Sequence, residues 1–407
     1  MAESGISRRK FIITGAAGVA AVGLGGLRGE SAAKESPAFP HIIERTLGRT
    51  GLKIPVVSFG VMNSDSPDLI RKAIDLGIRH LDTAHLYLRG NSETVIGLIL
   101  EERKCRDKMV LATKMYFDRD KDRKIFLPDG GGRGFPATEA RFDEQLALSM
   151  KRLRTDYLDI LYLHSCEAPQ MARYEPMIKI FTKAKEAGKT RFIGITTHTR
   201  EPETIRAAVD AGVWDVILTS YNFMQKHREE VRASILYAAE KGVGIVAMKT
   251  QGGVQMNRES PAQVNHRAAL KWALSEKNVC TAVPGITAFD QMDLDFGVMK
   301  DLSLSADEEE ALRKSAAVTS FCQQCGSCVG SCVQKAQIPT LMRAYMYAEA
   351  YHNLIQAEIA MAEIPKGQGL DACGRCEECS ALCRFGIPIN QRVRALAAFG
   401  FQGRRMS

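Results

Sequence analysis

The stretch YLDILYLHSCEAPQMARYEPMIKIFTKAKEAGKTRFIGIT, residues 157–196, decides the fold. It opens on an apolar run, Tyr157–His164, and continues through an amphipathic segment, Met177–Ala187, to a second apolar run, Thr190–Thr196. Gly188 stands where the helix should end, because glycine readily adopts the left-handed conformation that terminates helices. A strand, a helix and a second strand in close succession predict a parallel β–α–β unit.

The same alternation extends in both directions over residues 54–300. Further strands are predicted at Pro55–Gly60, Ile78–Asp82, Met109–Lys114, Val213–Tyr221, Val243–Lys249 and Val279–Pro284. Helical patterns cover Asp68–Leu76, Ser92–Arg103, Ala140–Leu153, Pro202–Ala211, Arg228–Glu240 and Ala262–Ser275. Eight strand–helix units predict an α/β fold, a (β/α)8 TIM barrel. A doubly wound sheet is the alternative, but no glycine-rich dinucleotide fingerprint follows the first predicted strand.

Two cysteine runs near the C-terminus share the pattern C-x2-C-x2-C-x3-C. They are Cys322, Cys325, Cys328, Cys332 and Cys373, Cys376, Cys379, Cys383. Bacterial ferredoxins hold [4Fe–4S] clusters with this spacing, and the fourth cysteine of each run usually ligates the other run's cluster. We therefore expect one cluster on Cys322, Cys325, Cys328 and Cys383. Cys373, Cys376, Cys379 and Cys332 would hold the second.

Other readings of the cysteines are weaker. A zinc site needs only four ligands and has other spacings, and disulfides favour small secreted scaffolds. Two features depart from the ferredoxin pattern: Val333 and Arg384 stand where proline commonly follows the fourth cysteine, and the insert 333–372 is long. A helix is predicted within the insert at Leu341–Ala362. The prediction for residues 316–395 is a small α-helical, ferredoxin-like iron–sulfur domain.

The N-terminus reads Ser7-Arg8-Arg9-Lys10-Phe11-Ile12, followed by a Gly/Ala-rich apolar stretch to about Leu27 and by Ser31-Ala32-Ala33. This resembles a twin-arginine export signal with a cleavage site, and predicts a signal peptide over residues 1–33. The chain would then engage the twin-arginine export machinery and work in the periplasm or elsewhere outside the cytoplasm. That route carries folded proteins, which suits a protein whose clusters are inserted before export. The alternative is a cytoplasmic protein with an uncleaved N-terminus.

The composition of the chain argues against nucleic acid and the membrane interior as partners. The formal net charge is +8, but the charges are interspersed, so no nucleic-acid surface is expected. Beyond the N-terminal stretch no segment is long and apolar enough for a membrane span, so none is expected after signal removal. A content of 45% hydrophobic residues permits a substantial core.

Polar side chains stand at the ends of the predicted strands, where barrel enzymes place their chemistry. The segments are LDTAHLY (residues 81–87), LATK (111–114) and LYLH (161–164), after an opening RTLGRTGLK (45–53). With these segments the chain resembles the aldo-keto reductase family over about residues 43–300, and the barrel domain is predicted over 42–315. The resemblance implies a catalytic set of Asp82, Tyr87, Lys114 and His164.

The chemistry of these four residue types is coherent. Reducing a carbonyl with hydride builds negative charge on oxygen, which requires a proton donor, here Tyr87. A phenol has an ordinary pKa near 10, so Lys114 is expected to lower it and Asp82 to fix the lysine. The imidazole of His164 would hydrogen-bond and orient the carbonyl oxygen.

The resemblance also implies a nicotinamide cofactor, with NADP or NAD left open. Thr196-Thr197-His198 stands where the family usually has a Ser-Asn amide clamp, and Met248 stands where an aromatic ring commonly stacks on nicotinamide. Val283-Pro284-Gly285 resembles the loop on the pyrophosphate side. The expected cofactor contacts are Met62, Thr196, Tyr221, Met248, Lys249 and Gly285. The charged loop 118–136 is expected over the catalytic face as a mobile lid or a solvated loop.

The sequence thus predicts an oxidoreductase of the aldo-keto reductase type that interconverts a carbonyl and an alcohol and carries two [4Fe–4S] clusters. Its partners would be a small-molecule carbonyl or alcohol substrate and a redox partner protein. The alternative is an exported electron-transfer protein whose barrel serves as a docking module.

Overall fold

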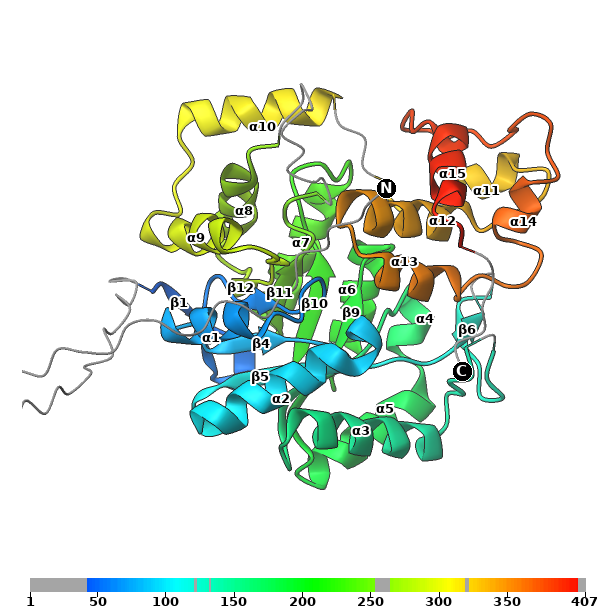
Figure 1. Cartoon of the computed structure of the whole chain (residues 1–407). Coiled ribbons are helices and arrows are strands. Elements are labelled where there is room, and N and C mark those ends of the chain that lie inside the picture. Colours follow the sequence, from blue (N-terminus) through cyan, green and yellow to red (C-terminus); the bar gives the residue numbers. More distant parts are fainter. Residues whose placement is uncertain (1–41, 121–122, 132, 253–263, 319–321, 402–407) are drawn as a thin grey trace, which may run out of the picture. The chain divides into compact units, whose positions relative to one another are not determined.

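The computed structural model describes residues 42–120, 123–131, 133–252, 264–318 and 322–401. All of them belong to one compact unit, Pro37–Ser407 (Figure 1). The predicted export signal, residues 1–33, lies outside the described residues, so its assignment stays a prediction. No helix in the described part of the chain is long and apolar enough to cross a membrane.

The core of the fold is an eight-stranded parallel sheet in the order β12-β11-β10-β9-β8-β5-β4-β3. Its strands are β3 (Phe59–Gly60), β4 (His80–Asp82), β5 (Val110–Met115), β8 (Leu158–Leu163), β9 (Thr190–Thr197), β10 (Val216–Ser220), β11 (Gly244–Met248) and β12 (Thr281–Ala282). Parallel bridges join Val57 to Ala282 and Gly60 to Gly285, which bring the first strand against the last. The sheet therefore curls round and closes, and the predicted α/β fold with eight parallel strands is confirmed.

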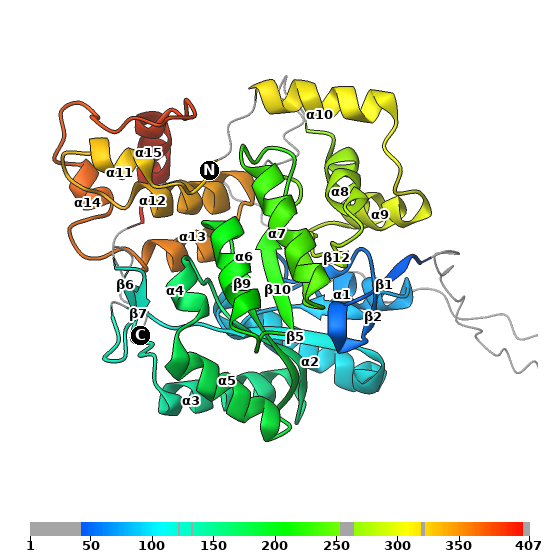
Figure 2. The same cartoon turned by 180° about the vertical axis from the view of Figure 1, so that it is seen from behind.

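Helices alternate with these strands and surround the sheet in both views (Figures 1 and 2). They are α1 (Pro67–Asp75), α2 (Asn91–Arg103), α3 (Glu139–Leu153), α4 (Pro169–Ala172), α5 (Glu175–Glu186), α6 (Glu201–Asp210), α7 (Arg228–Glu240), α8 (His266–Ser275), α9 (Phe289–Gly297) and α10 (Ala306–Val318). The apolar faces of α1 to α9 pack on the sheet because their apolar side chains leave water there, whereas Leu312 of α10 packs against α8.

An N-terminal hairpin closes one end of the barrel. Its strands β1 (Glu44–Thr46) and β2 (Lys53–Pro55) pair antiparallel, and Leu47 and Ile54 are fully buried among interior side chains of the sheet. Gly48, with φ of +50°, lies so close to the backbone at Gly242–Gly244 that a Cβ atom would clash. Because this end is plugged, the carboxyl ends of the strands at the opposite end are where a site can form.

The described residues of the loop 118–136 form a folded segment rather than a simple solvated loop. It contains a short antiparallel hairpin, β6 (Arg119–Asp120) and β7 (Ile125–Phe126), and Phe126 is almost fully buried. The Asp118 carboxylate accepts hydrogen bonds from the backbone N–H groups of Gly131 at 2.8 Å and Phe135 at 2.9 Å. These bonds fold the segment on itself, and the ion pair of Arg119 with Glu167, at 2.9 Å, joins it to the loop after β8.

The C-terminal segment is helical where it is described and has its own small core. Its helices are α11 (Ser327–Ser331), α12 (Ile338–Tyr345), α13 (Leu354–Met361), α14 (Leu370–Cys373) and α15 (Ile389–Ala398). The single helix predicted at Leu341–Ala362 is wrong. After α12 the chain forms a π-helical turn, Met346–Ala350, and His352 adopts a positive φ of 48° that no helix can continue through.

The C-terminal segment is fixed to the barrel by specific contacts. The Asn353 side chain donates hydrogen bonds to the Met62 carbonyl and to Asn63 Oδ1, each at 3.1 Å. Arg89, in the loop after β4, forms an ion pair with Glu358 of α13 at 2.5 Å. These partners follow β3 and β4, so α13 lies against the carboxyl ends of the strands.

Candidate active site

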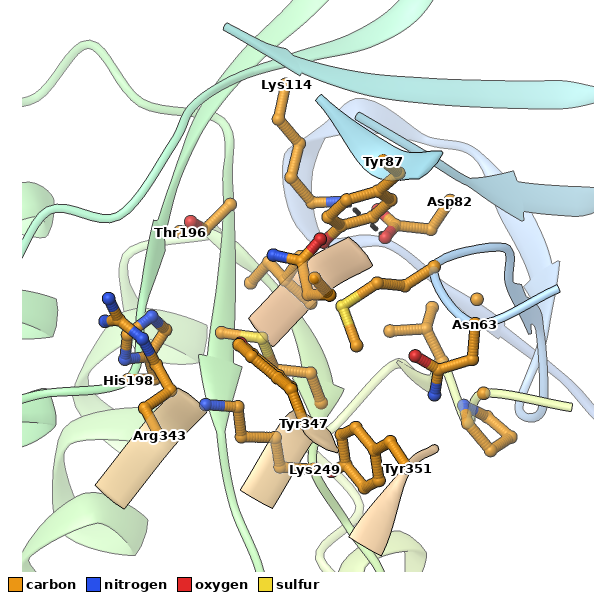
Figure 3. A pocket seen from close by; sticks show the side chains of 18 of the residues that line it. Asn63, Asp82, Tyr87, Lys114, Thr196, His198, Lys249, Arg343, Tyr347 and Tyr351 are labelled. Carbon is orange, nitrogen blue, oxygen red and sulfur yellow. Dashed lines mark hydrogen bonds and ion pairs between the residues drawn. The ribbon is translucent and has the colours of Figure 1, made fainter. Parts of the chain in front are cut away.

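Asp82 and Lys114 form the fixed centre of the site. Asp82 ends β4 and Lys114 lies near the end of the neighbouring β5, so the parallel pairing puts both at one edge of the sheet. The Lys114 ammonium donates hydrogen bonds to the Asp82 carboxylate and, at 2.6 Å, to the Thr83 carbonyl. Both side chains are almost completely buried, and the pair lies within the barrel mouth (Figure 3).

Tyr87 and His164 complete the set. Tyr87 begins a short 3-10 turn after β4, and its ring centroid lies 4.8 Å from the Lys114 Nζ atom. His164 follows β8, and its ring meets the Tyr87 ring edge-on, with centroids 6.0 Å apart. All four predicted catalytic side chains line one cavity of about 190 Å³. The structure therefore brings together side chains that are up to 82 positions apart (164 − 82) in the sequence.

Burial dominates the protonation of these groups. It raises the pKa of the Tyr87 phenol well above its ordinary value, and the Asp82 carboxylate raises it further. This is the reverse of the lowering by Lys114 expected from the sequence, because desolvation penalises a phenolate in a closed site more strongly than the lysine favours it. Burial also lowers the pKa of Lys114 and, with Lys114 nearby, holds the pKa of His164 well below its ordinary value. The resting site thus contains a neutral phenol and a neutral imidazole.

Five of the six predicted cofactor contacts line the same cavity: Met62, Thr196, Met248, Lys249 and Gly285. Tyr221 does not line it. It follows β10 on the side that faces the helices, and its ring packs against Trp272 of α8 with centroids 4.9 Å apart. The structure gives Tyr221 a packing contact outside the cavity.

The donor set of the cavity fits a nicotinamide dinucleotide. Gly285 leaves backbone exposed, and a Cβ atom there would come within 2.7 Å of the Asn63 amide. Lys249 supplies a cation suited to a phosphate, and the Met248 thioether suits contact with an aromatic ring.

Sequence reasoning missed the residues that close the cavity. Arg343 and Tyr347, which follow the first cysteine run, line it together with Tyr351 and Glu363, and Arg133 enters from the loop after β7. In Figure 3, Arg343 lies beside His198, and the Lys249 amine points toward them. No motif marks these residues. The available signal was an arginine followed by several tyrosines within the predicted helix of the insert.

The eight cysteines of the two runs lie in the C-terminal segment, and the runs are next to each other. The Ser331 hydroxyl accepts a hydrogen bond from the Leu382 N–H at 2.8 Å, and the Ser380 hydroxyl accepts one from the Val333 N–H at 3.1 Å. The thiols are free. Among the described residues, no group of three or more His, Cys, Asp or Glu side chains is arranged so that it could hold a metal ion.

The thiols that surround Cys328 and Cys373 come from both cysteine runs. Burial raises the pKa of Cys328 to about 12, and Cys322, Cys325 and Cys383 contribute to the increase. Burial likewise raises the pKa of Cys373 to about 11, with contributions from Cys332, Cys379 and Cys376. These last four thiols also line one cavity of about 280 Å³. Each group of neighbours combines three thiols of one run with the fourth thiol of the other.

The closed parallel barrel and the buried acid–lysine–tyrosine–histidine set define a class of oxidoreductases. The family model of the aldo/keto reductases matches residues 58–266, and the chain belongs to the aldo/keto reductase family. It is an oxidoreductase, and the family typically uses a nicotinamide dinucleotide.

Known proteins resemble the chain at the level of the family. L-galactose dehydrogenase of Arabidopsis thaliana is 29% identical over 303 residues, which cover 65% of this chain and 91% of that protein. Aldo-keto reductase YhdN of Bacillus subtilis is 32% identical over 172 residues, 42% of this chain and 48% of that protein. The solved holo form of an aldo-keto reductase from Bacillus halodurans has a TM-score of 0.55 at 24% identity and covers 69% of this chain and 98% of its own.

Proposed function

We propose that the protein interconverts a carbonyl compound and an alcohol by hydride transfer, with Tyr87 as the proton donor. The observation that carries this proposal is the burial of Tyr87, Lys114, Asp82 and His164 around one cavity. In the direction of reduction the hydride adds to the carbonyl carbon and the Tyr87 proton moves to the carbonyl oxygen. The phenolate that remains is stabilised by the Lys114 ammonium 4.8 Å from the ring centroid, and water returns the proton.

His164 acts through hydrogen bonding. Its neutral imidazole carries one N–H, and its Nδ1 atom has no hydrogen-bond partner among the described residues. An N–H aimed at the carbonyl oxygen orients the substrate and stabilises the developing alkoxide without moving its own proton. Asp82 keeps Lys114 charged and in place, so it is a positioning residue.

Thr196, Met248, Lys249 and Gly285 would hold the nicotinamide cofactor, which supplies or accepts the hydride when bound. Two features support this assignment. Lys249 lines the cavity and could contact a phosphate, and Gly285, in the loop after β12, has no side chain that would keep the cofactor away from the backbone. We propose NADP or NAD as the cofactor. Titration of the purified protein with NADPH and, separately, with NADH, monitored by the fluorescence of the bound nucleotide, discriminates between the two cofactors.

The test of the chemistry compares Tyr87→Phe with Tyr221→Phe, which removes a phenol outside the cavity. With 4-nitrobenzaldehyde and reduced nicotinamide, Tyr87→Phe should lower kcat by about 100-fold or more, the scale of general acid catalysis. Tyr221→Phe should keep the wild-type rate, and both should bind the nucleotide equally. Wild-type turnover by Tyr87→Phe would favour the other candidate, a barrel that serves as a docking module for electron transfer.

We also propose that residues 316–395 carry two [4Fe–4S] clusters, one on Cys322, Cys325, Cys328 and Cys383 and one on Cys373, Cys376, Cys379 and Cys332. The ferredoxin spacing and the crossed grouping of the thiols support this proposal. Anaerobically purified protein should contain about eight iron and about eight sulfide per chain. Stoichiometric zinc without iron would refute it.

Residues 1–33 are proposed as a twin-arginine signal ahead of the barrel domain, residues 42–315, and the protein as periplasmic or otherwise extracytoplasmic. The motif at Arg8 and Arg9 supports this. Free nicotinamide nucleotide is not a normal pool there, so the protein would retain its nucleotide tightly or exchange electrons with a partner protein through the clusters. Replacing both arginines by lysine should hold the protein in the cytoplasm, and unchanged fractionation would favour the cytoplasmic alternative.

A further inference from the structure

A cluster of buried charges lies beside the catalytic cavity and takes no part in the proton transfer. Three arginines contribute: Arg119 on β6, Arg133 in the loop after β7, and Arg343 on α12. Two carboxylates face them, Glu167 after β8 and Glu363 after α13. The side chains of all five are at least nine-tenths buried.

The ion pairs in this cluster share the two carboxylates among the three arginines. Arg119 lies 2.9 Å from Glu167 and 3.1 Å from Glu363. Arg343 is hydrogen-bonded to Glu363 and lies 3.7 Å from Glu167. Arg133 is the least well paired, with its nearest carboxylate oxygen, on Glu363, 3.5 Å away.

The charges of these five groups do not balance. Three guanidinium groups against two carboxylates leave one positive charge (3 − 2 = 1), and Lys249 lines the same cavity. A buried charge without a partner costs several kcal/mol, so such an excess persists only where something else provides a negative charge.

Arg133 shows where the compensating charge belongs. Its side chain is 2% exposed and lines the cavity, yet its Nε, Nη1 and Nη2 atoms have no partner in hydrogen-bond geometry among the described residues. Its guanidinium carbon lies 4.3 Å from the centroid of the Tyr116 ring, which fixes the group in place. A buried guanidinium with unused donors is suited to bind a carboxylate or phosphate.

The unused donors are close to the reacting atoms. The Tyr116 ring that supports Arg133 meets the His164 ring edge-on, with centroids 6.3 Å apart. On the other side Tyr347 interacts electrostatically with both Arg343 and Tyr87. A small molecule whose carbonyl contacts His164 and Tyr87 therefore has the two cavity-lining arginines, Arg133 and Arg343, within its own length.

We propose that the substrate carries an anionic group, a carboxylate by preference, which Arg133 and Arg343 bind while the carbonyl lies at Tyr87 and His164. The inference rests on the proposed carbonyl chemistry and adds the substrate class. A carboxylate is the preferred group because its two oxygens match the paired N–H donors of a guanidinium. The arginines are binding residues, since they do not contact the reacting oxygen.

Binding of benzoate tests the site without turnover. Calorimetric titration of the whole protein should show binding of benzoate, weak binding of phenyl phosphate and no binding of benzamide. Arg343→Gln and Arg133→Gln should each weaken benzoate binding by about 10- to 100-fold, the scale of a charge-assisted hydrogen bond. Arg313→Gln, which removes an exposed arginine of α10, should leave it unchanged. Equal binding of benzoate and benzamide by the wild-type protein would overturn the proposal, whatever the variants do.

The second arm separates the substrate from the cofactor. The ratio of kcat/KM for 4-carboxybenzaldehyde to that for 4-nitrobenzaldehyde should fall by about 10- to 100-fold in Arg343→Gln and recover in part in Arg343→Lys, which keeps the charge. Titration with NADP should be unaffected by Arg343→Gln. Loss of NADP binding with retained benzoate binding would assign the arginines to the cofactor and refute the proposal. If neither aldehyde is reduced, the proposed function fails, but benzoate binding still decides the anion site.

Discussion

At the scale of single residues, the active site depends on how burial changes charge. The Tyr87 phenol is held protonated by desolvation and by Asp82, so it is ready to donate a proton. The Lys114 ammonium then becomes important only when the phenolate forms. An interaction that appears in the transition state and is weak in the ground state is the kind that raises kcat.

Lys114→Met separates these roles. It should lower kcat for carbonyl reduction by about 100-fold or more, because the phenolate loses its cation. It should also destabilise the fold by about 3–5 kcal/mol, because the Asp82 carboxylate stays buried without its partner. The matched variant Lys114→Met with Asp82→Asn removes both charges. It should regain much of the free energy of unfolding in urea and none of the activity. Recovery of kcat in the double variant would contradict the role of the lysine.

His80 gives a prediction about acid stability. It is fully buried in β4, and burial lowers its pKa to about 4 from an ordinary 6.5. Below pH 6.5 the unfolded chain binds a proton that the folded one refuses, so stability falls as the pH drops from 6.5 toward 4. Between pH 7 and pH 5 this single group should account for about 2 kcal/mol of the loss.

Urea unfolding of His80→Gln at pH 7 and pH 5 measures the contribution of His80 to this loss. Between these two pH values the free energy of unfolding should decrease less in the variant than in the wild type. His227→Gln is the control of opposite sign. A hydrogen bond with Glu201 raises the pKa of His227, which therefore stabilises the fold below pH 6.5, and that stability is lost as the pH rises through the folded pKa. Its removal should steepen the acid loss. The same pH dependence in all three proteins would contradict both assignments.

At the scale of elements, the break between α12 and α13 decides how the cavity is covered. The sequence predicts one helix there because alanine, methionine and tyrosine run on without glycine or proline. What ends α12 is a π-helical turn and a left-handed His352, and neither has a local sequence marker. The restart is marked, since Asn353 caps α13 by accepting a hydrogen bond from the Gln356 N–H at 2.8 Å.

Asn353 therefore has two roles that substitutions can separate: it caps α13, and it attaches the helix to the barrel. Asn353→Ala removes the cap and the bonds to the barrel, and should cost about 1–3 kcal/mol and raise KM. Asn353→Asp keeps the cap acceptor but cannot donate to the Met62 carbonyl, so it should keep α13 and loosen only its contact with the barrel. Hydrogen exchange over Met346–Met361 should then increase throughout in the alanine variant and mainly before Asn353 in the aspartate variant. Identical exchange in both would show that the barrel contacts contribute nothing.

The barrel elements were predictable because each has a local cause. Buried parallel strands are continuous apolar runs, and glycines stop the helices between them, so their positions follow from short windows of sequence. The hairpin β6–β7 was missed, since its strands are only two residues long.

At the scale of the whole molecule, the site is formed by two parts of the chain that no motif connects. Asp82, Tyr87, Lys114 and His164 could be found because strand ends converge in a barrel. Arg343 and Tyr347 could not, because their place at the cavity depends on how the C-terminal segment packs on the loops after β3 and β4. Tyr221 was expected at the cofactor but lies outside the cavity, because the sequence does not show which side of β10 its ring faces.

The cysteine segment is linked to this cavity. Burial and Arg343 lower the pKa of Lys249 to about 7, and Cys322 is among the groups that oppose that change, so one predicted cluster ligand lies within electrostatic reach of a cavity residue. The Gln324 side chain joins the first cysteine run to α12, because it donates hydrogen bonds to Cys322 Sγ at 3.2 Å and to the Pro339 carbonyl in the first turn of α12 at 3.0 Å. Loss of the cluster on Cys322 should thus disturb α12, which carries Arg343.

Pairs of cysteine substitutions test which thiols share a cluster. If the fourth cysteine of each run serves the other run's cluster, Cys322→Ser with Cys383→Ser damages one cluster and leaves about four of eight iron. Cys322→Ser with Cys332→Ser damages both and leaves almost none. Pairing within each run predicts the reverse for these two variants, so iron analysis of anaerobic protein decides between the arrangements. The crossed grouping of thiols around Cys328 and around Cys373 favours the first outcome. Because Gln324 joins Cys322 to the Pro339 carbonyl of α12, the helix that carries Arg343, that double variant should also weaken benzoate binding, whereas Cys373→Ser with Cys332→Ser should leave it unchanged.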